Sequence, residues 1–133
     1  MSVYVTDTHP LVWFGNGKLS QLSKVAVQAF TNAEAGQAFI HIPSIVLYEV
    51  AILERLGRIK LNGGFMQWTN NLLANDGFGV AALETSVISL AAGYGFNQDP
   101  FDRVVVATAA DLSLPLITRD TAITDSGLVD LHW

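Results

Sequence analysis

Short apolar runs alternate along this chain with longer segments whose apolar residues have helical spacing. Runs typical of buried strands lie at 3–6, 38–42, 80–83 and 114–118, where they are bounded by turn-forming residues. A last short run at 128–131 predicts an additional edge strand. Each of the main runs is followed by a helical pattern, so the sequence predicts an α/β fold with a central, mainly parallel sheet.

Helix start and stop signals agree with this alternation. A short helical turn is expected at 10–14, and longer helices from a cap within 20–23 to 35, and over 45–56, 65–74 and 86–92. The clearest start is at Asp99-Pro100, because aspartate is a good N-cap and proline suits the first helical position.

Composition narrows the class of protein. The chain has 133 residues and no cysteine, which predicts a single domain over 1–133 without disulfides, in a reducing compartment. It shows no signal-peptide pattern and no apolar stretch long enough for a membrane span, so a cytoplasmic location is expected. Charged residues make up 14% of the chain against about 25% in an average domain, which favours a covering protein partner or self-association.

Acidic residues stand where predicted strands end and helices begin. Asp7 closes the first strand, Glu49 lies within the longest helical pattern, Asp102 opens a very apolar helix, and Asp120 follows the last main strand. In α/β proteins these positions converge on one crevice. Converging carboxylates repel each other unless a cation lies among them, so the pattern predicts a site for a hard divalent ion such as Mg²⁺ or Mn²⁺.

Each of these acids also has a purely structural interpretation. Asp7 and Asp120 can cap the helices that follow them, and Asp102 can favour a helix dipole. Asp99 is better explained as a cap than as a metal ligand. Glu49 is harder to explain structurally, because its neighbours along the helix are apolar and a buried carboxylate needs a partner.

Other chemistry has weaker support. The sequence has no phosphate loop, dinucleotide fingerprint, zinc-type histidine spacing or nucleophile elbow. The net charge is −5, which argues against a nucleic-acid binder unless bound cations reverse the local sign. Trp13, Trp68 and Trp133 fit a core or an interface better than base stacking. Phe65, Met66 and Trp68 fit a docking surface and core packing about equally well.

The ordered motifs resemble the PIN-domain family, and in particular its VapC-like toxin branch. The matching segments are residues 3–13, residues 43–59 around Glu49, the Asp-Pro-Phe-Asp-Arg segment at 99–103 with Ala-Thr-Ala at 107–109, and Leu-Ile-Thr-Arg-Asp at 116–120. They occur in family order and span nearly the whole chain. The chain departs from the branch at Asn97-Gln98, where a histidine is often found, and at Val46 and Tyr48.

The resemblance implies a three-layer α/β/α sandwich and metal-dependent endonucleolytic cleavage of RNA. It implies that Asp7, Glu49 and Asp102 ligate Mg²⁺ or Mn²⁺, with Asp120 as a fourth, more variable acid. Thr8 and Thr118 are then candidates for orienting metal waters, and Arg103 and Arg119 for contacting phosphate or pairing with the acids. It also implies a cognate antitoxin that covers the groove, and homodimerisation.

Two other functions stay open at this point. A housekeeping nuclease of the same fold would use the same acids for RNA processing or on DNA structures. A non-catalytic binding module would keep the fold without the reaction, although the presence of all four acids argues against it.

Overall fold

A parallel four-stranded sheet forms the centre of the molecule in the computed structural model, which describes all of residues 1–133. The strands are β1 (Ser2–Thr6), β2 (Ala38–Pro43), β3 (Phe78–Ala81) and β4 (Leu116–Ile117), arranged in the order β3-β2-β1-β4. Every pairing is parallel; Val5 lies opposite His41 of β2 on one side and Leu116 of β4 on the other. The predicted α/β class with a parallel sheet is confirmed.

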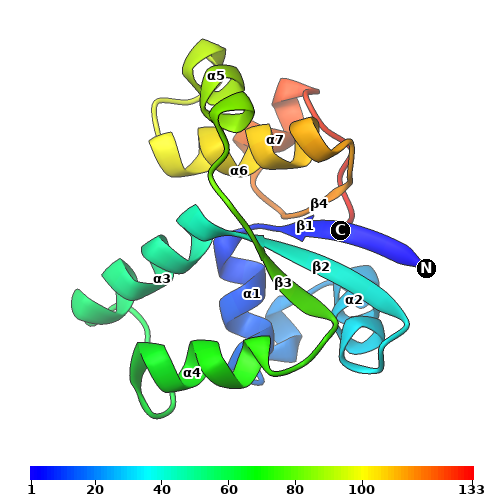
Figure 1. The fold of residues 1–133 in the computed structure, drawn as a ribbon, viewed down its shortest axis with the longest axis vertical. Coiled ribbons are helices and arrows are strands. Elements are labelled where there is room, and N and C mark those ends of the chain that lie inside the picture. The colour runs from blue at the N-terminus through cyan, green and yellow to red at the C-terminus, as the bar shows by residue number, and fades with distance from the viewer.

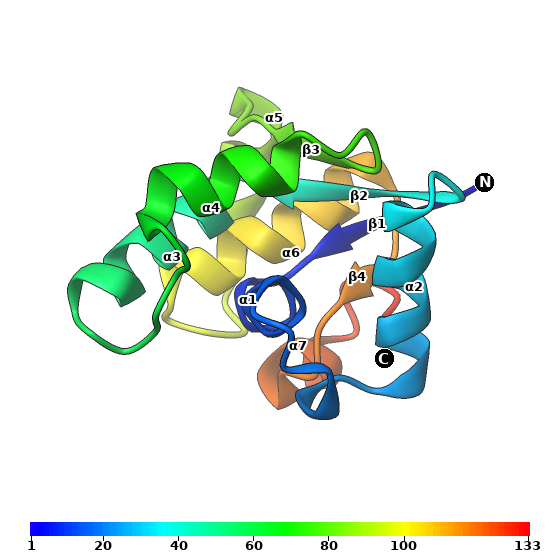
Figure 2. The same cartoon turned by 90° about the horizontal axis from the view of Figure 1, so that it is seen from below.

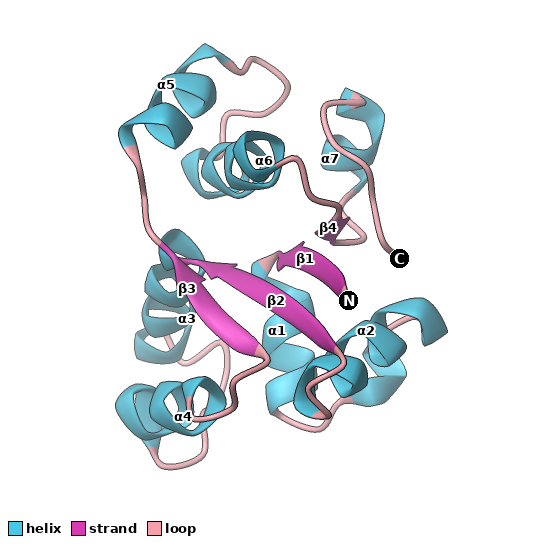
Figure 3. Cartoon of the chain, turned by 45° about the vertical axis from the view of Figure 1, so that its right-hand side comes forward, coloured by secondary structure: helices cyan, strands magenta, loops and turns pink.

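Helices cover both faces of this sheet, as Figures 1 and 3 show. One face carries α1 (Thr8–Gly15), α2 (Lys24–Glu34), α3 (Ser44–Arg55) and α4 (Gly64–Leu73), with a 3-10 turn at Leu19–Gln21. The other carries α5 (Thr85–Gly93) and α6 (Pro100–Leu112), and α7 (Thr121–Ser126) follows β4 on that side. The architecture is therefore the expected three-layer sandwich. No helix is both long and apolar enough to cross a bilayer.

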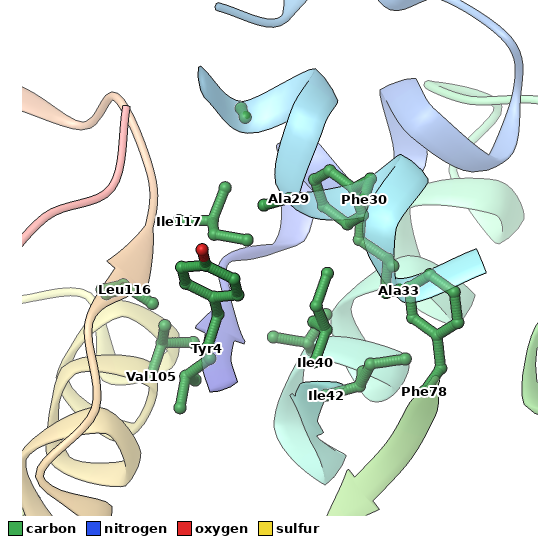
Figure 4. Close-up of a cluster of buried hydrophobic side chains, with 14 of the residues drawn as sticks. Tyr4, Ala29, Phe30, Ala33, Ile40, Ile42, Phe78, Val105, Leu116 and Ile117 are labelled. Carbon is green, nitrogen blue, oxygen red and sulfur yellow. The ribbon is translucent and has the colours of Figure 1, made fainter. Parts of the chain in front are cut away.

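Apolar side chains fill the space on both sides of the sheet. Figure 4 shows Phe30 of α2 beside Phe78 of β3, and Val105 of α6 beside Leu116 of β4. The rings of Phe14, Phe30 and Phe78 stack on one another, with the centroids of Phe14 and Phe30 4.7 Å apart. Strands that are buried on both faces explain why this chain is so rich in hydrophobic residues.

The strand bounds differ from the sequence prediction in two places. β3 begins at Phe78, two residues before the predicted start, because the carbonyl of Gly77 already accepts a hydrogen bond from the amide of Ile40 in β2. Only glycine fits at 77, since a Cβ there would lie 1.9 Å from the carbonyl oxygen of Ala33. β4 spans only Leu116–Ile117, and the expected edge strand at 128–131 is reduced to a single bridge between Leu116 and Leu131.

The order in which successive strands are added to the sheet reverses at β1, which makes β1 the topological switch point. The chain moves from β1 outward to β2 and β3, and then crosses back to place β4 on the other side of β1. Ligands of open α/β sheets bind at such a switch point, beyond the carboxyl ends of the strands. Seen from below in Figure 2, α1, α6 and α7 gather around this end of β1.

Candidate active site

Asp7 occupies the centre of the site, directly after β1. Its amide donates a 3.0 Å hydrogen bond to the carbonyl of Ile117, so the pairing with β4 continues to this residue. The Oδ1 atom caps α1 by accepting from the amide of Thr8 at 2.8 Å, and Oδ2 accepts from the Thr118 hydroxyl at 2.7 Å. Asp7 is thus a helix cap and a site carboxylate at once, joining both sides of the switch point.

Glu49 reaches the site from the middle of α3. Its carboxylate accepts a hydrogen bond from the hydroxyl of Thr8, the residue after Asp7. The side chain is half-buried, so the partner expected for this carboxylate is, within the chain, a threonine hydroxyl. Thr8 therefore connects the start of α1 to α3 and holds Glu49 beside Asp7.

Asp102 lies in the first turn of α6, and Asn97 in the preceding loop holds it. The Nδ2 group of Asn97 donates a 2.7 Å hydrogen bond to Asp102 Oδ2. The Oδ1 atom of the same amide accepts from the amide of Asp99, whose own carboxylate caps α6 by accepting from the amide of Phe101. The Asp99 cap is confirmed. The sequence singled out Asn97 only as a departure from the resembled branch, at a position where a histidine is often found, and its bond to Asp102 was not predicted.

Asp120 caps α7, as one of its two sequence interpretations predicted. Its Oδ1 atom accepts from the amide of Ile123 at 3.0 Å, and its own amide donates to the Thr118 hydroxyl oxygen at 3.1 Å. Because the same hydroxyl donates to Asp7, Thr118 links Asp120 to the central carboxylate.

The carboxylates are close enough to change one another's ionisation. Burial, and then the charges of Asp99, Asp7, Asp120 and Glu49, raise the pKa of Asp102 to about 7. Burial raises the pKa of Asp7 although hydrogen bonds from Thr118 and Thr8 oppose it. Burial also raises the pKa of Glu49, with a smaller contribution from Asp7. The structure therefore brings all four predicted acids, and Asp99, into one electrostatic cluster.

This cluster has the donor chemistry of a site for a hard cation, since every ligand it offers is a carboxylate oxygen. No three Asp, Glu or His side chains converge with the geometry of a finished metal site. Instead, their oxygens accept hydrogen bonds from Thr118, Thr8 and Asn97. A carboxylate group with a raised pKa and only neutral hydrogen-bond partners is an environment that favours a divalent cation.

A cavity of about 400 Å³ opens beside Asp7 and Asp120. His9 and Trp13 of α1 line it together with Thr118 and Arg119. The guanidinium carbon of Arg119 lies 4.5 Å from the ring centroid of Trp13. The other arginine near the acids, Arg103, instead donates through Nε to the carbonyl of Asn97. The two arginines that the sequence suggested thus have different surroundings.

Comparison with known proteins supports the resemblance seen in the motifs. The chain matches no protein-family model. It is 26% identical over 120 residues to the ribonuclease VapC22 of Mycobacterium tuberculosis, a match that covers 90% of this chain and 88% of that protein.

Solved structures agree on the fold. A chain of the VapBC2 complex of Rickettsia felis bound to a promoter DNA fragment superposes with a TM-score of 0.67 at 14% identity, covering 97% of this chain and 96% of that one. The chain thus resembles a VapC ribonuclease in sequence and has the fold of a chain in a VapBC complex.

Two further complexes contain chains of the same fold. A toxin–antitoxin complex from Klebsiella pneumoniae gives a TM-score of 0.62 at 19% identity, with 100% of this chain and 98% of that chain covered. A chain of FitAcB from Neisseria gonorrhoeae superposes with a TM-score of 0.63 at 19% identity, covering 98% of this chain and 96% of that one. This chain therefore aligns with each of the three structures along nearly its full length.

Proposed function

We propose that this protein is an endoribonuclease that uses Mg²⁺ or Mn²⁺, and that it is the toxin of a toxin–antitoxin pair. The observation that carries the proposal is the cluster of Asp7, Glu49, Asp102 and Asp120 at the switch point of a VapC-like fold. The four acids come from different elements and share no structural task that would require them to be adjacent.

Asp7, Glu49 and Asp102 would hold the cation, with Asp120 at the edge of the site. When bound, the cation would supply an activated water molecule and positive charge to offset that of the phosphodiester. The side chains around the acids hold the carboxylates in position. Thr118 and Thr8 hold the carboxylates of Asp7 and Glu49, and Asn97 fixes the carboxylate of Asp102. Such supporting hydrogen bonds keep the ligands oriented.

Exposed apolar side chains beside the acids support an antitoxin partner. Tyr48, next to Glu49 on α3, is 61% exposed, and its ring lies 6.1 Å from that of Phe101, next to Asp102. Leu56, which follows α3, and Met66 of α4 are also exposed, and we assign them to the same surface because α3 and α4 are in contact. A protein segment bound here would cover the acids and block the access of RNA. We propose that the antitoxin binds the α3–α4 surface and that cytoplasmic RNA binds at the acids.

A second group of exposed apolar residues, on β3 and α5, supports homodimerisation. It consists of Val80, Leu83, Ile88 and Leu90. β3 is an edge strand, and a second copy of the chain would protect that edge as well as the apolar side chains. The dimer proposed here leaves the α3–α4 surface free.

Cleavage of a mixed RNA pool by the purified, antitoxin-free protein tests the proposal. We expect cleavage with Mn²⁺ or Mg²⁺ and none with EDTA. Asp102→Asn should abolish it, whereas Asp76→Asn, an equal charge change at an exposed turn, should leave it intact. Metal-independent cleavage, or an Asp102→Asn protein as active as the wild type, would refute the assignment. A folded protein that cleaves nothing with either metal would favour a binding module.

A further inference from the structure

Arg119 lines the cavity beside Asp7 and Asp120, and its guanidinium group lies over the ring of Trp13 rather than against a carboxylate. Its neighbours Thr118 and Asp120 take part in hydrogen bonds with each other, with Asp7 and with α7, and none of these bonds involves the guanidinium group. Arg103, by contrast, is already bonded to the loop before α6. The N–H donors of Arg119 are therefore available at the cavity beside Asp7.

Trp13 explains why this arginine does not turn toward the adjacent carboxylates. The indole lies under the guanidinium at 4.5 Å, a distance at which the ring attracts a cation. Trp13 itself is placed by α1, the helix that Asp7 caps, and the ring of His9 lies 5.8 Å from it. The position of Arg119 is thus tied to the same helix as the central acid.

The cavity combines three features that suit a nucleotide. It holds a free cation with planar N–H donors, which match phosphate oxygens. It has aromatic rings from Trp13 and His9, against which a base can pack. It also borders the acids on the β4 side of the switch point. A base held in a duplex cannot enter a cavity of this kind, whereas an unstacked base of a single strand can.

We propose that Arg119, supported by Trp13 and flanked by His9, forms a subsite for the nucleotide next to the scissile phosphodiester of single-stranded RNA. Arg119 binds the backbone phosphate of that nucleotide, and its base rests against the aromatic side of the cavity. The subsite rests on the proposed ribonuclease function, which supplies the scissile bond. It makes Arg119 and Trp13 binding residues for the substrate, separate from the carboxylates that act at the reacting phosphate.

Salt dependence of RNA binding tests the subsite without relying on cleavage. A fluorescent single-stranded RNA oligonucleotide would be titrated with the inactive Asp102→Asn protein in Mn²⁺ at several KCl concentrations. Adding Arg119→Gln should weaken binding by about 10-fold and lower the slope of log K against log salt by about 0.7, the contribution of one phosphate contact on a single strand. Arg119→Lys should keep most of the slope because it keeps the charge.

Two further variants separate the subsite from general effects. Arg58→Gln removes an equal charge in the exposed turn after α3 and should change neither affinity nor slope. Trp13→Phe should weaken binding less than Arg119→Gln, because phenylalanine keeps a ring under the guanidinium. A thermal melt of each variant checks that it is folded, and Arg119, being exposed, can be replaced without disturbing the core.

The outcomes distinguish the subsite from the function itself. If the wild type cleaves RNA but Arg119→Gln leaves affinity and slope unchanged, the subsite is wrong and the ribonuclease stands. If the slope falls as expected but the wild type cleaves nothing, the phosphate contact is real and the proposed reaction is wrong. If the protein binds no single-stranded RNA at any salt concentration, the subsite is refuted.

Discussion

Neutral side chains hold the charged ones in place in this molecule. Thr8, Thr118 and Asn97 each donate a hydrogen bond to one carboxylate, so the three central acids are oriented without a lysine or arginine partner. Positive partners would lower the pKa values of the acids and compete with a metal ion. Neutral donors orient the oxygens while leaving the site negative.

Asn97 should therefore matter for activity although it carries no charge. Asn97→Ala removes the hydrogen bond to Asp102, which we propose to be a metal ligand; loss of such a supporting bond costs about 10–100-fold in metal affinity or activity. We expect that loss in kcat/KM for RNA, with part of it recovered at high Mn²⁺ concentration. The adjacent, exposed Gln98 provides the control, since Gln98→Ala should behave as the wild type. Equal activity of both variants at every Mn²⁺ concentration would contradict this role.

The raised pKa of Asp102 predicts how the stability of the metal-free protein depends on pH. The folded state binds this proton more tightly than the unfolded state, where the pKa is near 3.8. The resulting stabilisation is complete below about pH 4 and is lost as pH rises through the folded value of about 7. In EDTA, the wild type should lose more thermal stability than Asp102→Asn between pH 6 and pH 8.5.

The same experiment has a second arm. Mn²⁺ added at pH 8.5 should stabilise the wild type and have little effect on Asp102→Asn, because the metal replaces the proton in neutralising the cluster. Identical melting curves for the two proteins at both pH values would show that Asp102 does not titrate in this range.

The sequence named the acids and the two threonines of the candidate site, but not the hydrogen bonds between them, nor the bond from Asn97 to Asp102. Asp7 and Asp120 could be placed because strand ends in a parallel sheet must meet at one edge. The bond from Thr118 to Asp7 joins residues 111 positions apart, and that from Thr8 to Glu49 joins residues 41 apart. Which hydroxyl contacts which acid depends on the packing of α1 against α3 and on strand register, which local patterns do not contain.

At the scale of elements, α6 shows which parts of the fold are specified locally. Its start was predicted to the residue, because Asp99 and Pro100 set the first turn through their own hydrogen bonding and backbone angle. The bounds of β3 and β4 were predicted less well, because each depends on which residues of the neighbouring strand are available for hydrogen bonding. β4 is short because only Leu116 and Ile117 pair with β1 before the chain turns into the site.

Substitutions at Asp99 separate its two possible roles, as the N-cap of α6 and as a negative charge beside Asp102. Asp99→Asn keeps a good cap, so stability should change little, whereas Asp99→Ala should cost about 1 kcal/mol of unfolding free energy. Both substitutions remove the largest charge contribution to the raised pKa of Asp102 and should lower that pKa. Urea unfolding measures the first effect, and an NMR titration of the Asp102 carboxyl measures the second.

Metal-dependent cleavage by the same two variants tests the sequence interpretation of Asp99. A cap that ligates no metal should be replaceable by asparagine with most of the cleavage retained. Complete loss of cleavage in a stably folded Asp99→Asn protein would make Asp99 a metal ligand instead.

At the scale of the whole molecule, exposed apolar residues lie at two separate places. The α3–α4 surface begins at Tyr48, next to Glu49, and includes Met66, which is 66% exposed, whereas Ile88 belongs to α5 on the opposite side of the sheet. Of the three residues that suggested a docking helix, Met66 is exposed while Trp68 is buried in the core. Core packing is therefore confirmed for Trp68, and docking at Met66 stays a prediction.

Substitutions on the α3–α4 surface and on the β3–α5 surface should have independent effects on antitoxin binding and on dimerisation. Met66→Glu should weaken antitoxin binding, measured by calorimetry, and leave RNA cleavage by the free protein intact. Ile88→Glu should shift the protein from dimer to monomer in sedimentation experiments without weakening antitoxin binding per chain. A Met66→Glu protein that is inhibited by antitoxin as strongly as the wild type would place the antitoxin elsewhere.

The bond between Asp7 and Thr118 has a consequence for the time course of synthesis. A ribosome adds about 5–20 residues per second, so the 111 positions between the two residues take on the order of ten seconds to make. During that interval the growing chain carries Asp7, then β2 and Glu49, but not β4, the second partner strand of β1, nor Thr118 beyond it. The proposed active site therefore stays incomplete on the ribosome until β4 and Thr118 have been synthesised.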